Sequence, residues 1–181
     1  MKKEKKIDRA VLRSLLRLYL IFGAVMGLFV VAFFLLPVRQ HVISPFTSFI
    51  AVCSSFLMNV FGAGSYVSGT MLATSQYSID IVDGCNGIYA TAILISGVIA
   101  YPSTLKDKIW GILLGTAAIF ALNLGRVISL FYMGQHYPDI FNEVHVYVWQ
   151  PIIILWAIFI WDFWSRRIKK ETALGPGAVS A

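Results

Sequence analysis

The chain has little charge and little cysteine. Only 13% of its 181 residues are charged and 58% are hydrophobic, with a mean hydropathy of +0.75. Soluble globular domains carry roughly 25% charged residues, so this composition excludes one and indicates a single membrane domain. The two cysteines form no CxxC pair and no cluster with the three histidines. We therefore expect no metal site and no cofactor.

The charges that are present are mostly basic and flank apolar segments. The formal net charge is +6, but basic clusters beside apolar runs are typical of cytoplasmic membrane flanks rather than of nucleic-acid binding. We expect no nucleic-acid partner. The basic residues of these flanks are Lys2, Lys3, Lys5, Lys6, Arg9, Arg13, Arg17, Lys106, Lys108, Arg166, Arg167, Lys169 and Lys170.

Four apolar segments are expected to cross the membrane, at 18–36, 87–101, 109–134 and 144–161. The first is long enough to span a hydrocarbon core of about 30 Å. It is not followed by a small-residue cleavage site, so we interpret it as a retained anchor rather than a signal peptide.

The segment between the first two spans has a different character. Residues 45–62 place apolar and polar side chains on opposite faces of a helix, which predicts an amphipathic helix in the membrane interface. Its hydrophobicity would also tolerate insertion, but a fifth span would put Lys106, Lys108 and the basic C-terminal end outside. Residues 64–83 contain alternating stretches that predict two short strands, forming a hairpin.

The predicted architecture is an all-α integral membrane bundle. It has about four transmembrane helices, one interfacial amphipathic helix and a short extracytoplasmic β-hairpin. Residues 1–17 would form a basic cytoplasmic N-terminus, 18–165 a single membrane domain, and 166–181 a basic and then disordered cytoplasmic tail.

This topology brings Cys85, Arg126 and His145 to similar depths near the outer boundary. Arg126 lies about 26 Å beyond Ile109 along a helix, and a guanidinium at a helix centre costs about 2.5–3.5 kcal/mol. It could snorkel to the headgroups or point inward as a donor to a developing oxyanion. Asn123 lies on the same face and favours the inward orientation.

Cys85 begins the second span between Gly84 and Asn86. It could be a packed thiol, or it could form a disulfide with Cys53 in an oxidising compartment. Cys53 itself sits among apolar side chains and is interpreted as a core residue. A helix N-terminus, however, favours the thiolate and predicts a lowered pKa. Glycines on either side of the turn would allow close approach of another backbone.

His145 is the best partner for this thiol among the three histidines. His41 lies in a linker and His136 in a turn-rich loop, whereas His145 begins a helix that Pro151 is expected to kink. A lone histidine is commonly of no consequence, but a Cys–His pair with a nearby cation is suited to acyl transfer. The residues themselves therefore favour acyl transfer at the membrane surface.

Three motifs resemble one known family. They are "DGCNGIYA" around Cys85, "ALNLGRVISLFYMGQHYP" around Arg126 and "HVYVWQP" from His145. In order and placement they resemble the exosortase/archaeosortase family of integral-membrane transpeptidase-like proteins, most closely the exosortase H subgroup. Asp83 stands where the family pattern has asparagine.

The resemblance implies a cysteine protease or transpeptidase in the bacterial inner membrane, multi-pass, with its active site facing the periplasm. Cys85 would be the nucleophile, His145 the base and acid, and Arg126 the oxyanion stabiliser. Substrates would be secreted proteins with a C-terminal IPTL-type motif, a transmembrane helix and a basic end. The thioester would pass to an amine acceptor or to water.

Further residues near these motifs are expected to contact substrate, and membrane lipid would surround the bundle. The expected substrate-contacting residues are Asn86, Asn123, Tyr77, Asp80 and Asp83. Two other functions remain open. One is a non-enzymatic assembly or transport component with Arg126 and Asn123 as structural polar residues. The other is an enzyme of lipid or phosphate chemistry, which would be expected to have more charge on its outer face.

Overall fold

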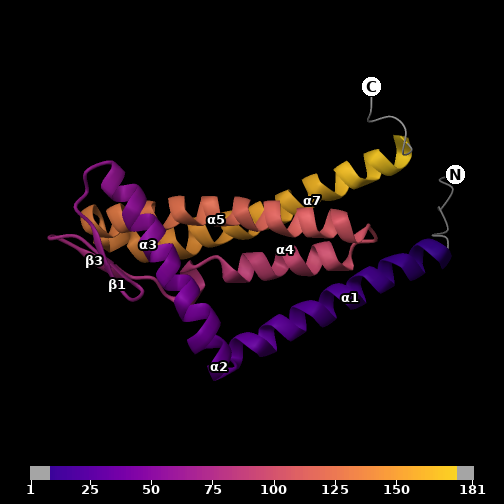
Figure 1. Cartoon of the computed structure of the whole chain (residues 1–181), viewed down its shortest axis with the longest axis horizontal. Coiled ribbons are helices and arrows are strands. Elements are labelled where there is room, and N and C mark those ends of the chain that lie inside the picture. The colour runs from indigo at the N-terminus through magenta and orange to yellow at the C-terminus, as the bar shows by residue number, and fades with distance from the viewer. Residues whose placement is uncertain (1–8, 175–181) are drawn as a thin grey trace, which may run out of the picture.

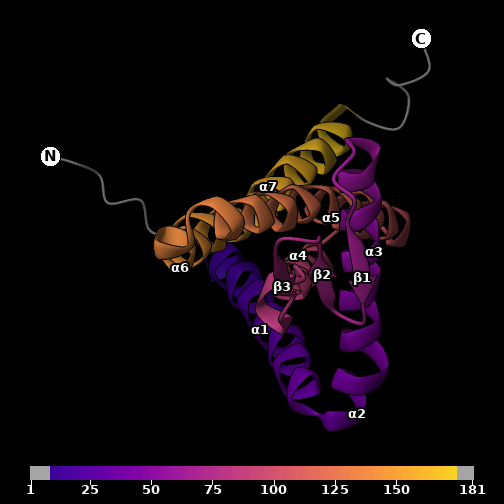
Figure 2. The same cartoon turned by 90° about the vertical axis from the view of Figure 1, so that its left-hand side faces the viewer.

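The computed structural model describes residues 9–174, and the surroundings of side chains from 12 to 168. The described chain is a helical bundle with a small sheet at one end (Figures 1 and 2). In chain order the elements are α1 (Arg9–Phe34), α2 (Leu36–Val38), the π-helix η1 (Arg39–Ile43), α3 (Ser44–Val60), β1 (Tyr66–Ser68), β2 (Met71–Ala73), β3 (Ser78–Asp80), the 3₁₀ turn η2 (Asp83–Cys85), α4 (Ile88–Ala100), α5 (Leu105–His136), the 3₁₀ turn η3 (Pro138–Ile140), α6 (Phe141–Glu143), the π-helix η4 (Val144–Trp149) and α7 (Gln150–Leu174).

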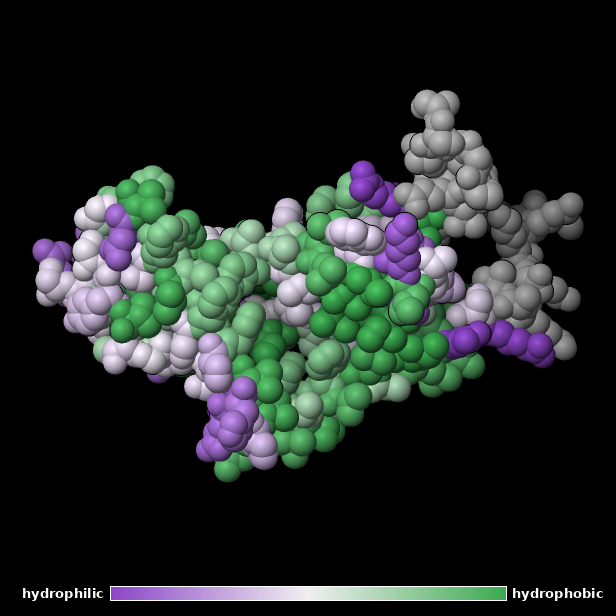
Figure 3. Space-filling model, viewed as in Figure 1, coloured by the Kyte–Doolittle hydropathy of each residue, from purple (hydrophilic) through white to green (hydrophobic). Residues whose placement is uncertain are grey.

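The long helices give the molecule two distinct ends. In Figure 1 the start of α1, the α4–α5 connection and the end of α7 lie at one end, and the sheet lies at the other. Apolar side chains cover much of the middle of the face in Figure 3, and the most hydrophilic residues gather towards its ends. The predicted all-α membrane bundle is confirmed by this arrangement.

Helix α5 connects two hydrophobic cores. It begins with a capping box in which Thr104 and Asp107 satisfy each other's backbone N–H groups. One core packs α4, α5 and α7 together, and the other packs α3 and the sheet against the far half of α5. Ile119 belongs to the first core and Val127 to the second, and the buried polar residues Asn123 and Arg126 lie between them. The helix thus places two polar groups at the junction of the cores.

The end of the molecule that carries the sheet is built from α3 and a three-stranded antiparallel sheet in the order β1-β2-β3. The predicted hairpin is present, but three strands form rather than two because β2 also pairs with β3. Helix α3 crosses the long helices at a steep angle in Figure 1. Its buried residues Ile50, Ala51 and Met58 pack with Leu72 of the sheet, so α3 and the sheet form one unit against α5.

Four helical segments are long and apolar enough to cross a membrane, but they differ from the four expected. They are Leu12–Phe34, Leu36–Val60, Leu105–His136 and Pro138–Ile168. Helix α4 has only 13 residues, about 20 Å of helix, because it begins after Gly87 and ends before Pro102. By length and composition Leu36–Val60 qualifies as a span, so the interfacial position of 45–62 stays a prediction, and the steep crossing of α3 in Figure 1 favours it.

Helices α1 and α7 extend beyond the predicted span boundaries. Helix α1 begins at Arg9, within the basic flank, and α7 continues to Leu174. Residues 171–174 are therefore helical although they belong to the tail predicted to be disordered. The rest of that tail, 175–181, and residues 1–8 lie outside the described residues.

Candidate active site

Cys85 occupies a short turn that precedes α4. Its N–H donates to the Val82 carbonyl at 2.8 Å, and Gly87 then enters α4 with φ +77°. A Cβ at position 87 would lie 3.2 Å from Cγ of Asn123. The left-handed conformation and the close approach both favour glycine here. This glycine therefore lets the cysteine turn pack directly against α5.

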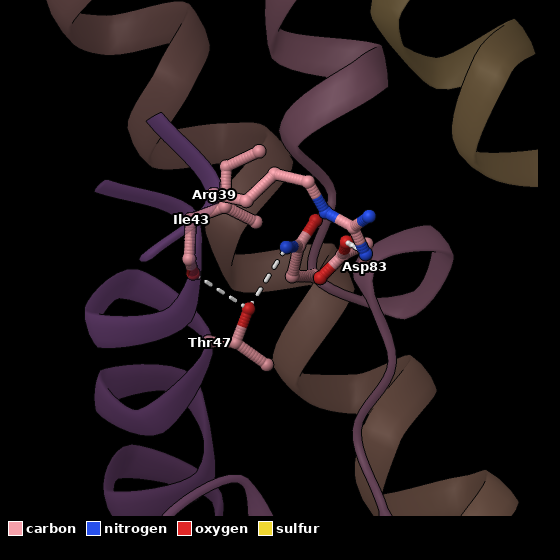
Figure 4. A network of polar contacts seen from close by, with 5 residues as sticks. Arg39, Ile43, Thr47 and Asp83 are labelled. Carbon is pink, nitrogen blue, oxygen red and sulfur yellow. Dashed lines mark hydrogen bonds and ion pairs between the residues drawn. The ribbon is translucent and has the colours of Figure 1, made fainter. Parts of the chain in front are cut away.

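Residues on both sides of Cys85 are tied to η1 and to the first turn of α3 (Figure 4). Arg39 of η1 forms an ion pair with Asp83 at 2.9 Å. Asn86 donates from Nδ2 to Oγ1 of Thr47 at 2.9 Å, and Thr47 donates to the Ile43 carbonyl at 2.8 Å. Oδ1 of Asn86 also accepts the Ile88 N–H at 3.0 Å. The side chain expected to contact substrate is thus engaged at both ends in holding the turn.

Arg126 is fully buried, so it does not snorkel to the surface. Its Nη2 donates to Sγ of Cys85 at 3.8 Å and to Oε1 of Gln150 at 3.0 Å. Nε and Nη1, and both amide atoms of the buried Asn123, have no hydrogen-bond partner among the described residues. Buried polar groups are usually paired, so these four atoms are available donors and acceptors beside the thiol.

His145, in the π-helix η4, completes the cluster. Its Nε2 lies 2.9 Å from Sγ of Cys85, within hydrogen-bonding distance, and the ring packs against Phe141 with centroids 6.0 Å apart. The structure therefore brings together the thiol, imidazole and guanidinium that the sequence placed at similar depths.

The π-helix η4 determines which way His145 faces. Its backbone closes one residue later than an α-helix, as in the Gln150 N–H to His145 carbonyl bond. Residues 144–145 and 149–150 are half-buried, whereas 146–148 between them are exposed. In a continuous α-helix His145 would lie about 100° away from its present face. The extra residue puts His145 and Gln150 on the same inner face.

The pKa of the Cys85 thiol differs from the expected one. Burial raises the pKa of Cys85, and the charge and hydrogen bond of Arg126 oppose that shift without cancelling it. The lowered pKa predicted from a helix N-terminus is wrong, because Cys85 lies in a desolvated 3₁₀ turn before α4 begins. The free thiol is mostly neutral near pH 7, and its proton must be taken by a base.

We expect the alkylation rate of Cys85 to rise with pH to a midpoint above that of an ordinary cysteine. The thiolate is the reactive form, and it appears only as the pH rises through the raised pKa. Arg126→Gln is expected to move the midpoint higher still, because it removes the group that opposes the effect of burial. Stopped-flow alkylation in a Cys53→Ala background measures both, and a midpoint below that of free cysteine would contradict the assignment.

The remaining expected substrate contacts lie nearer the sheet. Asp80 is exposed and accepts a hydrogen bond from Thr70 at 2.6 Å. Tyr77 packs edge-on against Phe131, with centroids 5.4 Å apart, and its hydroxyl lies against Gly134. These two residues stabilise the sheet and its contact with α5. Among the described residues, neither forms a hydrogen bond with Cys85.

The other candidate thiol and imidazoles lie apart from the cluster. Cys53 and Cys85 are both free, so no disulfide joins them. Cys53 lines a shallow apolar depression with Val52, Phe56, Leu57 and Leu124. Nδ1 of His41 contacts the Pro37 carbonyl at 3.0 Å, and His136 is exposed at the end of α5.

An apolar cleft of about 520 Å³ opens beside the cysteine turn. It lies between α3, α4 and α5, with Phe46 and Phe49 on one wall and Ile112 and Phe120 on another. Asn86, the residue after Cys85, reaches its lining. Figure 3 shows the surface hollowed beside α3. The cleft thus runs from the apolar middle of the bundle towards the turn that carries Cys85.

The sequence model of the transmembrane exosortases matches residues 9–160. This chain belongs to the transmembrane exosortase family. The match includes all three members of the cluster, Cys85, Arg126 and His145, and confirms the resemblance seen in the motifs. Family membership makes the chain a multi-pass membrane protein and supports a transpeptidase role in general. Neither the curated proteins nor the solved structures contain a match to it.

Gln150 and the ties to α3 were not predicted from the sequence. Gln150 precedes a proline in an otherwise apolar segment, and that isolated polar residue was a usable signal of the kind that identified Asn123. The Arg39–Asp83 and Thr47–Asn86 contacts had no such signal, because their partners are distant in sequence and depend on how α3 turns back.

Proposed function

We propose that this chain is a membrane-embedded cysteine transpeptidase or protease that cleaves C-terminal sorting signals of secreted proteins. The observation that carries this proposal is the 2.9 Å separation of Cys85 Sγ from His145 Nε2, with Arg126 donating to the same sulfur. A thiol, a base and a buried cation from three helical segments form the minimum set for acyl transfer through a thioester.

The first half-reaction uses His145 as a base. Nε2 takes the thiol proton as Sγ attacks the carbonyl carbon of the scissile peptide, so a C–S bond forms and the carbonyl oxygen becomes an oxyanion. Arg126 stabilises that charge through its unpaired Nη1 and Nε. When the tetrahedral species collapses, the C–N bond breaks and the leaving amine takes the proton from His145. The product is a thioester on Cys85.

The second half-reaction reverses these roles. An amine acceptor or water loses a proton to His145 and attacks the thioester carbonyl. The C–S bond breaks, and the Cys85 thiolate recovers its proton from the imidazolium. The chemistry is the same for transfer and hydrolysis, so the nucleophile that reaches the thioester decides the outcome. The turn that carries Cys85 precedes α4 on the side of the sheet, away from the basic flanks at the start of α1 and the end of α7, and this placement supports reaction at the periplasmic surface.

The unpaired atoms around the thiol favour catalysis over a purely structural role. If Arg126 and Asn123 served only to join helices, their polar atoms should be satisfied by neighbouring helices. Instead both amide atoms of Asn123 and two guanidinium nitrogens lack partners among residues 12–168. A peptide group entering the site would supply an acceptor for the guanidinium and both partners for the amide. Asn123 is therefore proposed to hold the substrate backbone.

The apolar cleft supports recognition of a substrate that carries a membrane helix. Its walls are suited to an apolar segment that approaches from the side, and its lining reaches Asn86 beside the thiol. A sorting signal with an IPTL-type motif before its helix would then place the scissile bond near Cys85. Helix α3 and the sheet cover this region and limit the access of water.

Intact-mass analysis tests the proposed function. The chain is co-expressed with a secreted reporter ending in an IPTL-type motif, an apolar helix and a basic end, and is then quenched in acid. We expect a mass increment on Cys85 equal to the reporter portion before the scissile bond, removable by hydroxylamine as a thioester is. A reporter with a scrambled motif is the control. Cleavage that continues in Cys85→Ala without any adduct would refute the proposal.

A further inference from the structure

We propose that Gln150 is a positioning residue that fixes the orientation of the Arg126 guanidinium at the thiol. This inference rests on the proposed function. Gln150 stands at the start of α7, half-buried, and its Oε1 accepts a hydrogen bond from Nη2 of Arg126 at 3.0 Å. Among the described residues it is the only oxygen acceptor that the Arg126 side chain contacts.

The hydrogen count of Nη2 explains why this contact sets direction. A guanidinium Nη carries two hydrogens in a rigid planar fork. At Nη2 one is directed to Oε1 of Gln150 and the other to Sγ of Cys85. With both committed, the plane of the group is fixed, and Nη1 and Nε remain for an incoming oxygen. Without Gln150, only the long 3.8 Å contact to sulfur would hold the fork.

The neutral amide is suited to this position. A carboxylate would hold the guanidinium at least as tightly, but it would also cancel the positive charge that acts on the thiol and the oxyanion. An amide oxygen provides the direction and leaves the charge intact. The π-helix makes the contact possible, since it puts His145 and Gln150 on one face so that a single segment supplies the base and aligns the cation.

A double-mutant cycle on Cys85 alkylation tests the proposal on the full-length chain in detergent, in a Cys53→Ala background. We expect Arg126→Gln to slow alkylation below the thiol midpoint by about threefold or more. In a Gln150→Met background the fold-change in alkylation rate caused by Arg126→Gln should be at least three times smaller, because the guanidinium is no longer aligned. An equal effect in both backgrounds overturns the proposal.

Two further variants separate alignment from simple packing. Gln150→Glu keeps the acceptor and adds a charge, so alkylation should slow as it does in Arg126→Gln, and wild-type behaviour would overturn the proposal. Gln150→Asn is one methylene shorter and should lose the coupling to Arg126, as Gln150→Met does. If the Gln150→Met variant does not fold, Gln150→Asn replaces it in the double-mutant cycle. Gln40→Met makes the same change at an exposed glutamine of η1. It should leave unchanged both the alkylation rate of Cys85 and the effect of Arg126→Gln on that rate.

Because alkylation needs no substrate, the two proposals fail separately. Coupling between Gln150 and Arg126 without any processed reporter would leave the positioning role standing and remove the transpeptidase. A processed reporter with no coupling would keep the transpeptidase and remove the role of Gln150.

Discussion

Cys85→Ala is expected to abolish processing of a sorting-signal reporter, with a loss on the order of 10⁴-fold or more. No other thiol lies within reach of His145 among the described residues, so nothing replaces the lost nucleophile. The ratio of processed to unprocessed reporter, read by immunoblot after co-expression, measures the effect. Cys85→Ser is expected to be nearly as inactive, because the hydroxyl is a much weaker nucleophile at neutral pH.

Cys53→Ala is the matched control for that experiment. Cys53 lies on α3 in a shallow apolar depression, and among the described residues it forms no hydrogen bond with Cys85, Arg126 or His145. Its truncation should leave processing within about twofold of wild type, as surface substitutions usually do. If Cys85→Ala processed the reporter as well as Cys53→Ala does, the thiol would have no catalytic role.

Deleting Val148 from the π-helix is expected to reduce processing about 10²–10⁴-fold, as loss of a general base does. The deletion retains every residue of the proposed site. It removes the extra residue of η4, so His145 should turn about 100° relative to α7 and leave the thiol. The reporter assay measures the loss, which should match that of His145→Ala.

Val148→Ala controls for the side chain. Val148 is exposed on the outer side of η4, so its truncation leaves the helical register intact and should leave processing within about threefold of wild type. A deletion variant as active as Val148→Ala would show that the register of η4, and hence the His145–Cys85 contact, is unnecessary.

The sequence predicted the long helices better than the pairing of the short strands and the packing contacts between elements. The apolar runs of α1, α5 and α7 and the amphipathic pattern of α3 each follow from local periodicity, and all are present. The three strands of 66–80 are only three residues long, and the pairing of β2 with β3 depends on packing against α3 and α5. Local alternation gave the hairpin but not the third strand.

Within the site, residue type was informative and register was not. Cys85 and His145 were identifiable because each is chemically unusual at the start of an apolar segment, and Arg126 because it is a charged residue within one. Gln150 was missed because helical periodicity of 3.6 residues places it away from His145, and only the π-helix brings them together. The raised pKa of Cys85 was also inaccessible, since desolvation depends on neighbours that sequence position does not reveal.

The shortness of α4 has a consequence for the depth of the cysteine turn. At about 20 Å the helix covers roughly two-thirds of a typical hydrocarbon thickness of about 30 Å, while the 32 residues of α5 exceed it. Because α4 packs against α1, α5 and α7, and Tyr89 is its one exposed residue, the longer neighbouring helices and not acyl chains enclose the depth that α4 leaves uncovered. Cys85, in the turn before α4, is therefore recessed relative to the end of α5, and protein packing rather than lipid sets its depth.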